Sequence, residues 1–496
     1  MAVVQSFRLK IIGRLINEKP LILLTLIYFL FRLSNLTRLP IFNDESIYLH
    51  WSQIITKTHH YFYPALFDGK QPLPIWLFSL AGFFSSNLFL AGRLTVVLIG
   101  LGTTIGVFLT ARRIFDRKIA FWLALIYLLV PYVFFFERMA LMEGMLNFIA
   151  IWSFYLTFCL LEKPRTKLAI ILGVILGVGM WIKSSSIFFV FLAFLSLLAG
   201  YLFKKKNRRY LIVTVYSLII FLFVFVPLFL HSSYRLIAQK DLEFRLSTGE
   251  LLSFPLNLWL RNLRFYSSWL LFYATPFLLI SGLLGLRKNY LALWFFLPFL
   301  AAIFLSRQPN SRYIVLMTPF LVLLAGEAFR FSEKRKPFFI VVFVLVVIPC
   351  LFYDLIQLIK PEKFFNCFPP NQAILVDKSQ YITNWTSGYG VEPVVEYLNR
   401  ASKEEKILVG VRLDSGNPES AIFVYLLKNP NLEIFYYPLD KPSIELLTSA
   451  EFQYKAFIVT RDNQLGGMDN YLEEINKFYK PESKNYVGLY QVKKIE

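Results

Sequence analysis

Charge and cysteine are both scarce in this sequence, and each shortage excludes a class of protein. Charged residues make up 17% of the 496 residues, against about 25% in an average soluble domain. Hydrophobic residues reach 56%, and the mean hydropathy is +0.54. A chain this apolar cannot hide its surface inside one water-facing globule, so soluble, disordered and collagen-like proteins are excluded. We expect an integral membrane protein.

Several familiar catalytic and metal-binding motifs are also missing. The three cysteines, Cys159, Cys350 and Cys367, lack metal-ligand spacing, so we expect neither a cysteine zinc site nor structural disulfides. There is no GxxxxGK[ST] phosphate loop, no HExxH and no GxSxG, and His59-His60 is the only histidine pair. The chemistry must therefore come from other residues.

The net charge of +20, from 52 Lys and Arg against 32 Asp and Glu, would at first suggest nucleic-acid binding. The basic residues, however, form short clusters between apolar runs, which is the positive-inside pattern of a multi-pass membrane protein. These clusters lie at residues 112–118, 163–167, 204–209, 287–288 and 330–336. With Arg8, Lys10, Arg14 and Lys19, they predict a cytoplasmic N-terminus and no nucleic-acid partner.

Apolar runs near the roughly 20 residues needed to cross a bilayer recur through the first three quarters of the chain. They predict about eleven transmembrane helices, near residues 20–37, 87–111, 119–136, 142–161, 168–183, 185–203, 210–230, 265–286, 290–306, 311–329 and 337–359. Two outward loops, 38–86 and 231–263, are long and rich in Trp, Tyr and charge. Within the first loop, residues 47–51 and 74–78 are expected to form helices with aromatic faces on the membrane interface.

From about residue 363 the composition becomes that of a soluble domain. Residues 407–411 and 456–459 have the length and flanking charge of strands, while 392–399 and 471–479 suggest helices. We therefore expect a transmembrane domain over 1–362 and a small α/β domain over 363–496. Eleven crossings would deliver this second domain to the extracytoplasmic side.

The sharpest chemical signal is Asn43-Asp44-Glu45, just beyond the outer end of the first helix. A carboxylate there can act as general base on a hydroxyl. The alternative is that Asn43 or Asp44 simply caps the next helix, and the sequence alone gives the two interpretations equal weight.

A second acid, Glu143, begins a membrane helix, where ionisable residues are costly and usually functional. Its alternative role is a favourable interaction with the positive end of that helix. Glu137 and Arg138, in the same outward turn, are expected to lie among lipid headgroups.

Cations gather on the same outer side: Lys70, Arg93, Lys183 and Arg312. Carboxylates and cations together suit a reaction that expels a phosphate, because one group takes a proton while others hold the anion. Each cation alone could instead reach toward lipid phosphates.

The ordered series of motifs resembles the membrane-embedded GT-C glycosyltransferases, in particular the protein-mannosyltransferase and aminoarabinose-transferase-like group. The series covers most of residues 20–360, and residues 385–390 resemble the start of the soluble domain of some bacterial members. Its motifs are Asp44-Glu45, Lys70-x-Pro72-Leu73, Arg93, Arg112-x-x-Phe115, Glu143, Gly173, Gly177 and Gly179 followed by Lys183, and Arg312-Tyr313 before Pro319.

The resemblance implies an inverting transferase that moves a sugar from a polyprenyl-phosphate donor to a hydroxyl of a lipid, glycan or protein. Asp44 would be the base with Glu45 in support and Glu143 as a further catalytic acid. Lys70, Lys183, Arg312 and Arg93 would hold the lipid phosphate. Many members carry Asp where this chain has Glu143. Some members use a divalent cation and others do not, so Asp44 and Glu143 are candidates for holding one.

The expected location is a bacterial or archaeal plasma membrane, with protein glycosylation or cell-envelope modification as the process. The alternative function is a membrane transporter or lipid flippase. A transporter would place polar groups near mid-membrane and show repeats, whereas here the ionisable residues crowd one face.

Overall fold

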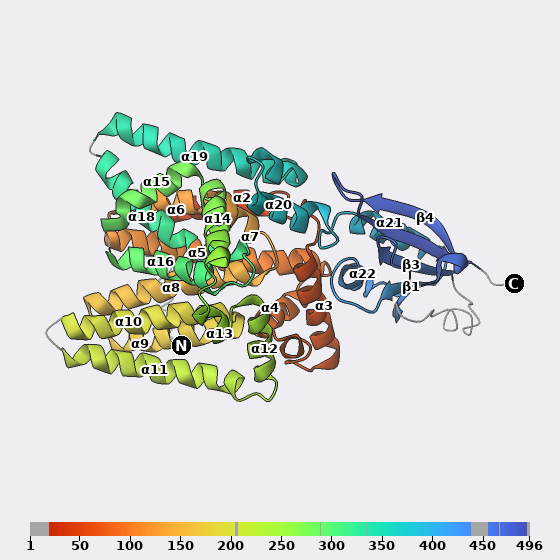
Figure 1. The fold of residues 1–496 in the computed structure, drawn as a ribbon, viewed down its shortest axis with the longest axis horizontal. Helices are drawn as coiled ribbons and strands as arrows, with labels where there is room; N and C mark the ends of the chain where they lie inside the picture. Colours follow the sequence, from red (N-terminus) through yellow and green to blue (C-terminus); the bar gives the residue numbers. More distant parts are fainter. Residues whose placement is uncertain are drawn as a thin grey trace, which may run out of the picture. The chain divides into compact units, whose positions relative to one another are not determined.

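The computed structural model describes residues 19–203, 207–287, 289–333, 335–437, 455–465 and 467–493 (Figure 1). The basic residues Arg8, Lys10 and Arg14, and parts of three predicted basic clusters (204–206, 288 and 334), lie outside these ranges.

Two compact units alternate along the chain. The first, here the helical unit, comprises the chain up to Ser34, Leu66–Leu73 and Val96–Leu358. The second, here the sheet unit, comprises Asn35–Ala65, Pro74–Thr95 and the chain from Ile359. The sheet unit thus combines most of the predicted outer loop 38–86 with the predicted soluble domain.

The helical unit is built almost entirely from helices (Figure 1), most of them apolar. Asp116 begins one of them by accepting hydrogen bonds from the backbone of Lys118 and Ile119, at 2.8 and 2.9 Å. Pro131 starts the next, where its missing N–H costs nothing. The helices are α2 Lys19–Leu33, α6 Arg117–Leu129, α7 Pro131–Phe136, α8 Met142–Glu162, α9 Thr166–Ile182, α10 Ile187–Phe203, α11 Arg208–Phe229, α12 Tyr234–Phe244, α13 Thr248–Leu252, α14 Leu256–Tyr273, α15 Pro276–Leu284, α16 Asn289–Leu305, α17 Arg312–Val315, α18 Thr318–Glu333 and α19 Lys336–Ile359, with α5 Leu88–Ile114 shared between the units.

The chain is a multi-pass helical membrane protein, as the hydropathy predicts. Among the described residues, five helices are long and apolar enough to cross a bilayer: α5, α8, Ser184–Phe203, α11 and Pro337–Ile359. α14 and α15, bent by 103° at their junction, make a sixth if they form one span. Most other predicted spans coincide with shorter or broken helices such as the 17-residue α9, so five or six spans stand where eleven were predicted.

The two predicted helices of the first outer loop are present in the sheet unit, as α3 Asn43–Thr58 and α4 Leu73–Gly82. Their expected orientation is wrong for α3, because Tyr48 and Trp51 are buried inside the protein. α3 packs against a helix of the C-terminal part, where His50 stacks on Phe423 with ring centroids 4.4 Å apart. The C-terminal part therefore packs on this loop.

The C-terminal part contains a five-stranded mixed sheet of order β2-β1-β3-β5-β4. Its first three strands run parallel, while β5 pairs antiparallel with both β3 and β4. The strands are β1 Ile407–Arg412, β2 Leu432–Tyr437, β3 Lys455–Arg461, β4 Leu472–Tyr479 and β5 Tyr486–Val492, and the helices are α20 Gln372–Lys378, α21 Val391–Ala401 and α22 Glu419–Leu426. The predicted strands 407–411 and 456–459 and the predicted helix 392–399 are confirmed.

The predicted helix over 471–479 is wrong, because this segment is strand β4. The pairing of β4 with β5 skips Ile475, which is a bulge between Glu474 and Asn476. The bulge spaces Leu472, Ile475 and Phe478 at intervals of three, which imitates a helical pattern.

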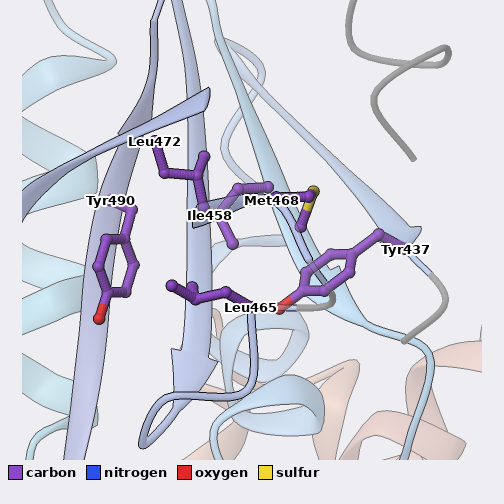
Figure 2. Close-up of a cluster of buried hydrophobic side chains, with 6 residues drawn as sticks. All are labelled: Tyr437, Ile458, Leu465, Met468, Leu472 and Tyr490. Carbon is purple, nitrogen blue, oxygen red and sulfur yellow. The ribbon is translucent and has the colours of Figure 1, made fainter. Parts of the chain in front are cut away.

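One core of the sheet gathers side chains from four strands and one connection. Figure 2 shows Tyr437, Ile458, Leu472 and Tyr490 of the strands together with Leu465 and Met468 of the segment after β3. Burial of such side chains, at about 25 cal/mol per Å² of apolar surface, stabilises the strand layer.

Candidate active site

The predicted acid pair lies in the first turn of α3. Phe42 occupies the N-cap position, and its backbone N–H donates to Glu45 Oε2 at 2.9 Å. Asn43 and Asp44 are therefore the first two residues inside the helix, and the interpretation of either as the N-cap is wrong. Asn43 Nδ2 lies 3.3 Å from Asp44 Oδ1 and donates to it. The positive end of the helix favours the ionised carboxylate of Asp44.

Glu45 forms a buried two-point ion pair with Arg93 of α5. Arg93 Nε lies 2.9 Å from Glu45 Oε1, and Nη2 lies 2.7 Å from Oε2. Both side chains are essentially inaccessible, at 0% and 1% exposure. Arg93 Nη1 also donates to the carbonyls of Leu36 and Leu39, at 2.7 and 2.8 Å. Arg93 therefore ties the chain before α3 to the carboxylate beside Asp44.

A second group of predicted residues meets in the helical unit. Lys183 is the C-cap residue of α9, and Glu143 lies in the first turn of α8. Lys183 Nζ donates to Glu143 Oε1 at 2.6 Å. The Glu143 side chain is 4% exposed and that of Lys183 is 28% exposed. The charge of Arg312 acts on both, and the Tyr313 ring centroid is 5.9 Å from Lys183 Nζ.

Lys70 belongs to the same region, together with an acid that the sequence analysis missed. Asp241 of α12 accepts a hydrogen bond from Ser184 and interacts electrostatically with the ammonium groups of Lys70 and Lys183. Ser184 Oγ in turn accepts from Gln71 Nε2 at 2.6 Å, next to Lys70. Burial raises the pKa of the Asp241 carboxyl, although its cationic neighbours and Ser184 oppose that shift. The only available signal was its place in the charged outward loop 231–263.

The predicted site residues thus fall into two groups. Glu143, Lys70, Lys183 and Arg312 belong to the helical unit, while Asp44, Glu45 and Arg93 belong to the sheet unit.

The expectation that Glu137 and Arg138 lie among headgroups is wrong. Glu137 is fully buried and accepts from Arg32 Nε at 3.1 Å and from Tyr127 Oη at 2.9 Å. Arg138 Nη1 donates to the carbonyl of Phe31 at 2.8 Å. A buried acid needs such partners, so these residues join α2 to the bundle instead of reaching lipid.

The acids of the described ranges do not fit a metal site. No cluster of three or more His, Cys, Asp or Glu side chains able to hold a metal ion occurs there. The carboxylate of Glu143 already binds the Lys183 ammonium. No step proposed below uses a metal.

The fold of the whole chain is similar to that of solved membrane proteins. It matches ArnT from Cupriavidus metallidurans bound to undecaprenyl phosphate with a TM-score of 0.58 and 15% identity, covering 94% of this chain and 97% of that one. It also matches the Archaeoglobus fulgidus oligosaccharyltransferase in complex with Zn and sulfate, with a TM-score of 0.51 and 11% identity, covering 94% and 73%.

The family resemblance is confirmed on the sequence as well. Residues 69–231 match the family described as dolichyl-phosphate-mannose-protein mannosyltransferase, a range that includes Lys70, Arg93, Glu143 and Lys183. No curated protein matches the chain. Residues 69–231 are therefore similar to the protein-mannosyltransferase family, and the whole chain shares the fold of ArnT.

Proposed function

We propose that this enzyme transfers a sugar from a polyprenyl-phosphate donor to a hydroxyl of a lipid, glycan or protein acceptor. The observation that carries the proposal is the cluster in the helical unit, where Lys70, Lys183 and Arg312 gather around two acids. The excess of cations suits an anion such as the phosphate of the donor. The similar fold of a protein bound to undecaprenyl phosphate supports this choice.

Lys183 and Lys70 are the proposed ligands of the donor phosphate. The phosphate gains negative charge as the bond to the sugar breaks, and cations already held in place stabilise that charge without reorganising. Glu143 fixes the Lys183 ammonium through the 2.6 Å ion pair. Arg312 adds a further positive charge to the same region.

Asp44 is the proposed general base. It would take the proton from the acceptor hydroxyl as the oxygen attacks the anomeric carbon and the donor phosphate leaves. This direct displacement forms no bond between sugar and enzyme, so the anomeric configuration inverts. The negative charge of a carboxylate in the first turn of a helix interacts favourably with the helix N-terminus.

Arg93 takes a different role from the predicted one. We expected a phosphate ligand, but its guanidinium already pairs with Glu45 and donates to backbone carbonyls. We assign Arg93 and Glu45 to positioning the turn that carries Asp44.

The proposed topology follows from the basic loops. The N-terminus lies in the cytoplasm, the chain crosses the membrane of a bacterium or archaeon an odd number of times, and residues 363–496 lie outside. The predicted outer loop 38–86, which carries both Asp44 and Lys70, then faces the extracytoplasmic side.

The test is label transfer. The purified enzyme is incubated with undecaprenyl phosphate carrying radiolabelled mannose, glucose, galactose or arabinose, together with a membrane extract. The proposal predicts that label from at least one donor moves into lipid, glycan or protein with inverted configuration. Movement of an intact labelled lipid across a vesicle membrane without sugar transfer would instead support a flippase and overturn the proposal.

A further inference from the structure

The backbone just before Asp44 is held by the segment Trp385–Gly390. The N–H of Asn43 donates to the carbonyl of Thr386 at 3.0 Å. The first N–H groups of a helix have no partner within it, so Thr386 supplies an acceptor that α3 needs. A Cβ on Gly388 would collide with the backbone of Ile41, so only glycine permits this close approach.

The loop between β1 and α22 also binds Ile41, Asn43 and Thr386. The buried Asn417 donates from Nδ2 to the carbonyls of Ile41 and Thr386, at 3.0 Å each. Its own backbone N–H donates to Asn43 Oδ1 at 3.0 Å. Gly416 has a φ of +108°, which favours glycine, and a Cβ there would strike Asn43 Oδ1.

Buried charges fix both segments to the sheet. Arg461 of β3 donates from Nε and Nη2 to the fully buried Glu419, at 3.0 and 2.7 Å. The Arg461 guanidinium carbon lies 4.2 Å from the ring centroid of Trp385. Lys480, which follows β4, donates to the carbonyl of Ser387 at 2.6 Å.

We propose that Thr386, Gly388 and Asn417 are positioning residues, forming a cradle that holds the first turn of α3 so that Asp44 meets the acceptor hydroxyl. This inference rests on the proposed role of Asp44 as base. The contacts converge on Ile41 and Asn43, and Asn43 itself donates to Asp44. A displacement of about 1 Å at a catalytic group can cost about a hundredfold in rate.

The cradle gives the C-terminal part a catalytic purpose. Its hydrogen bonds end on the backbone that sets the direction of the Asp44 side chain, one residue away. Removing one of them should therefore change turnover more than it changes donor binding, because none of these hydrogen bonds is made to a proposed phosphate ligand.

The first experiment compares Asn417→Ala with the matched control Asn429→Ala in lipid nanodiscs. Asn429 also donates two side-chain hydrogen bonds in the C-terminal part, to Asn399 and Ser402, and neither acceptor belongs to α3. Loss of two hydrogen bonds should speed amide exchange at residues 43–46 about tenfold in Asn417→Ala, and leave it unchanged in Asn429→Ala. Asn43→Ala repeats the test from the α3 side and leaves the sheet intact.

The second experiment measures turnover of the undecaprenyl-phosphate sugars in two backgrounds. Asn417→Ala should lower kcat about tenfold or more in the parent, with unchanged donor affinity, but have no further effect in Asp44→Asn. Equal amide exchange at residues 43–46 in Asn417→Ala and Asn429→Ala would contradict the positioning role of the cradle. So would a loss of kcat on Asn417→Ala that is as large in Asp44→Asn as in the parent. Full turnover of Asp44→Asn would instead overturn the base proposal, and the exchange comparison would then decide the cradle alone.

Discussion

Replacing Lys183 with Met should lower turnover and stability for two separable reasons. Loss of one prearranged donor to the developing phosphate charge should cost about 10²–10³ in kcat. Loss of the ion-pair partner also strands Glu143, whose side chain is 4% exposed. Breaking a buried pair costs about 3–5 kcal/mol, and the 28% exposure of Lys183 favours the lower end of that range.

A second change separates these two effects. Glu143→Gln removes the stranded charge, so the double variant Lys183→Met/Glu143→Gln should regain most of the lost thermal stability in detergent. Its turnover should nevertheless stay about 10²–10³ below that of Glu143→Gln alone, because the phosphate still lacks a cation. The assay is transfer of radiolabel from the undecaprenyl-phosphate sugars.

The control is Lys118→Met, which breaks another Lys–Glu pair. Lys118 lies 2.8 Å from Glu333, but its side chain is 63% exposed, so its loss should change stability by less than about 1 kcal/mol and leave turnover intact. If Lys183→Met/Glu143→Gln turned over as fast as Glu143→Gln alone, Lys183 would serve only its ion pair and the phosphate assignment would be refuted.

Three further predictions concern the sheet unit and the topology. Arg93→Lys keeps the charge but loses the two-point geometry with Glu45, and should destabilise the protein by about 2–3 kcal/mol in thermal unfolding; unchanged stability would contradict the positioning role. Burial lowers the pKa of Lys480 to about 8 in the folded protein. Between pH 8 and about 10.5 the unfolded chain therefore binds more protons than the folded protein, and the free energy of unfolding rises with pH. The stability of the parent should rise relative to that of Lys480→Met across this window, and parallel stability curves for the two proteins would exclude the shift. A reporter enzyme fused after Glu496 should be active only on the extracytoplasmic side; cytoplasmic activity would overturn both topology and mechanism.

The sequence predicted the features that depend on local composition. Long apolar runs predicted a helical membrane protein, and short runs bounded by charge predicted β1 and β3, because both patterns are decided within a few residues. The helix predicted over 471–479 failed, since a bulge at Ile475 gave a strand a helical spacing. The structure has fewer spans than the eleven predicted, among the residues it describes. Helix breaks such as that between α14 and α15 lie within continuous apolar stretches, so the hydropathy does not reveal them.

The site was predictable in residue type but not in pairing. Glu143 and Lys183 were singled out separately, and only the fold shows that they form one ion pair. Arg93 was expected at the phosphate because a cation in sequence carries no mark of its partner, and its pairing with Glu45 depends on tertiary structure. Asp241 was not predicted, because its interactions with Ser184, Lys70 and Lys183 also depend on tertiary structure.

The most direct measurement is the turnover of Asp44→Asn, compared with Asp68→Asn, which changes another acid of the same outer loop. Asn keeps the shape of Asp44, and loss of its charge at the start of α3 should cost only about 0.3–1 kcal/mol, so the variant should fold. It cannot take the proton of the acceptor hydroxyl, and its rate of sugar transfer should fall about 10²–10⁴-fold while donor binding is retained. Asp68→Asn should transfer sugar at the parental rate. Transfer by Asp44→Asn at the rate of Asp68→Asn would contradict the assignment of Asp44 as the base.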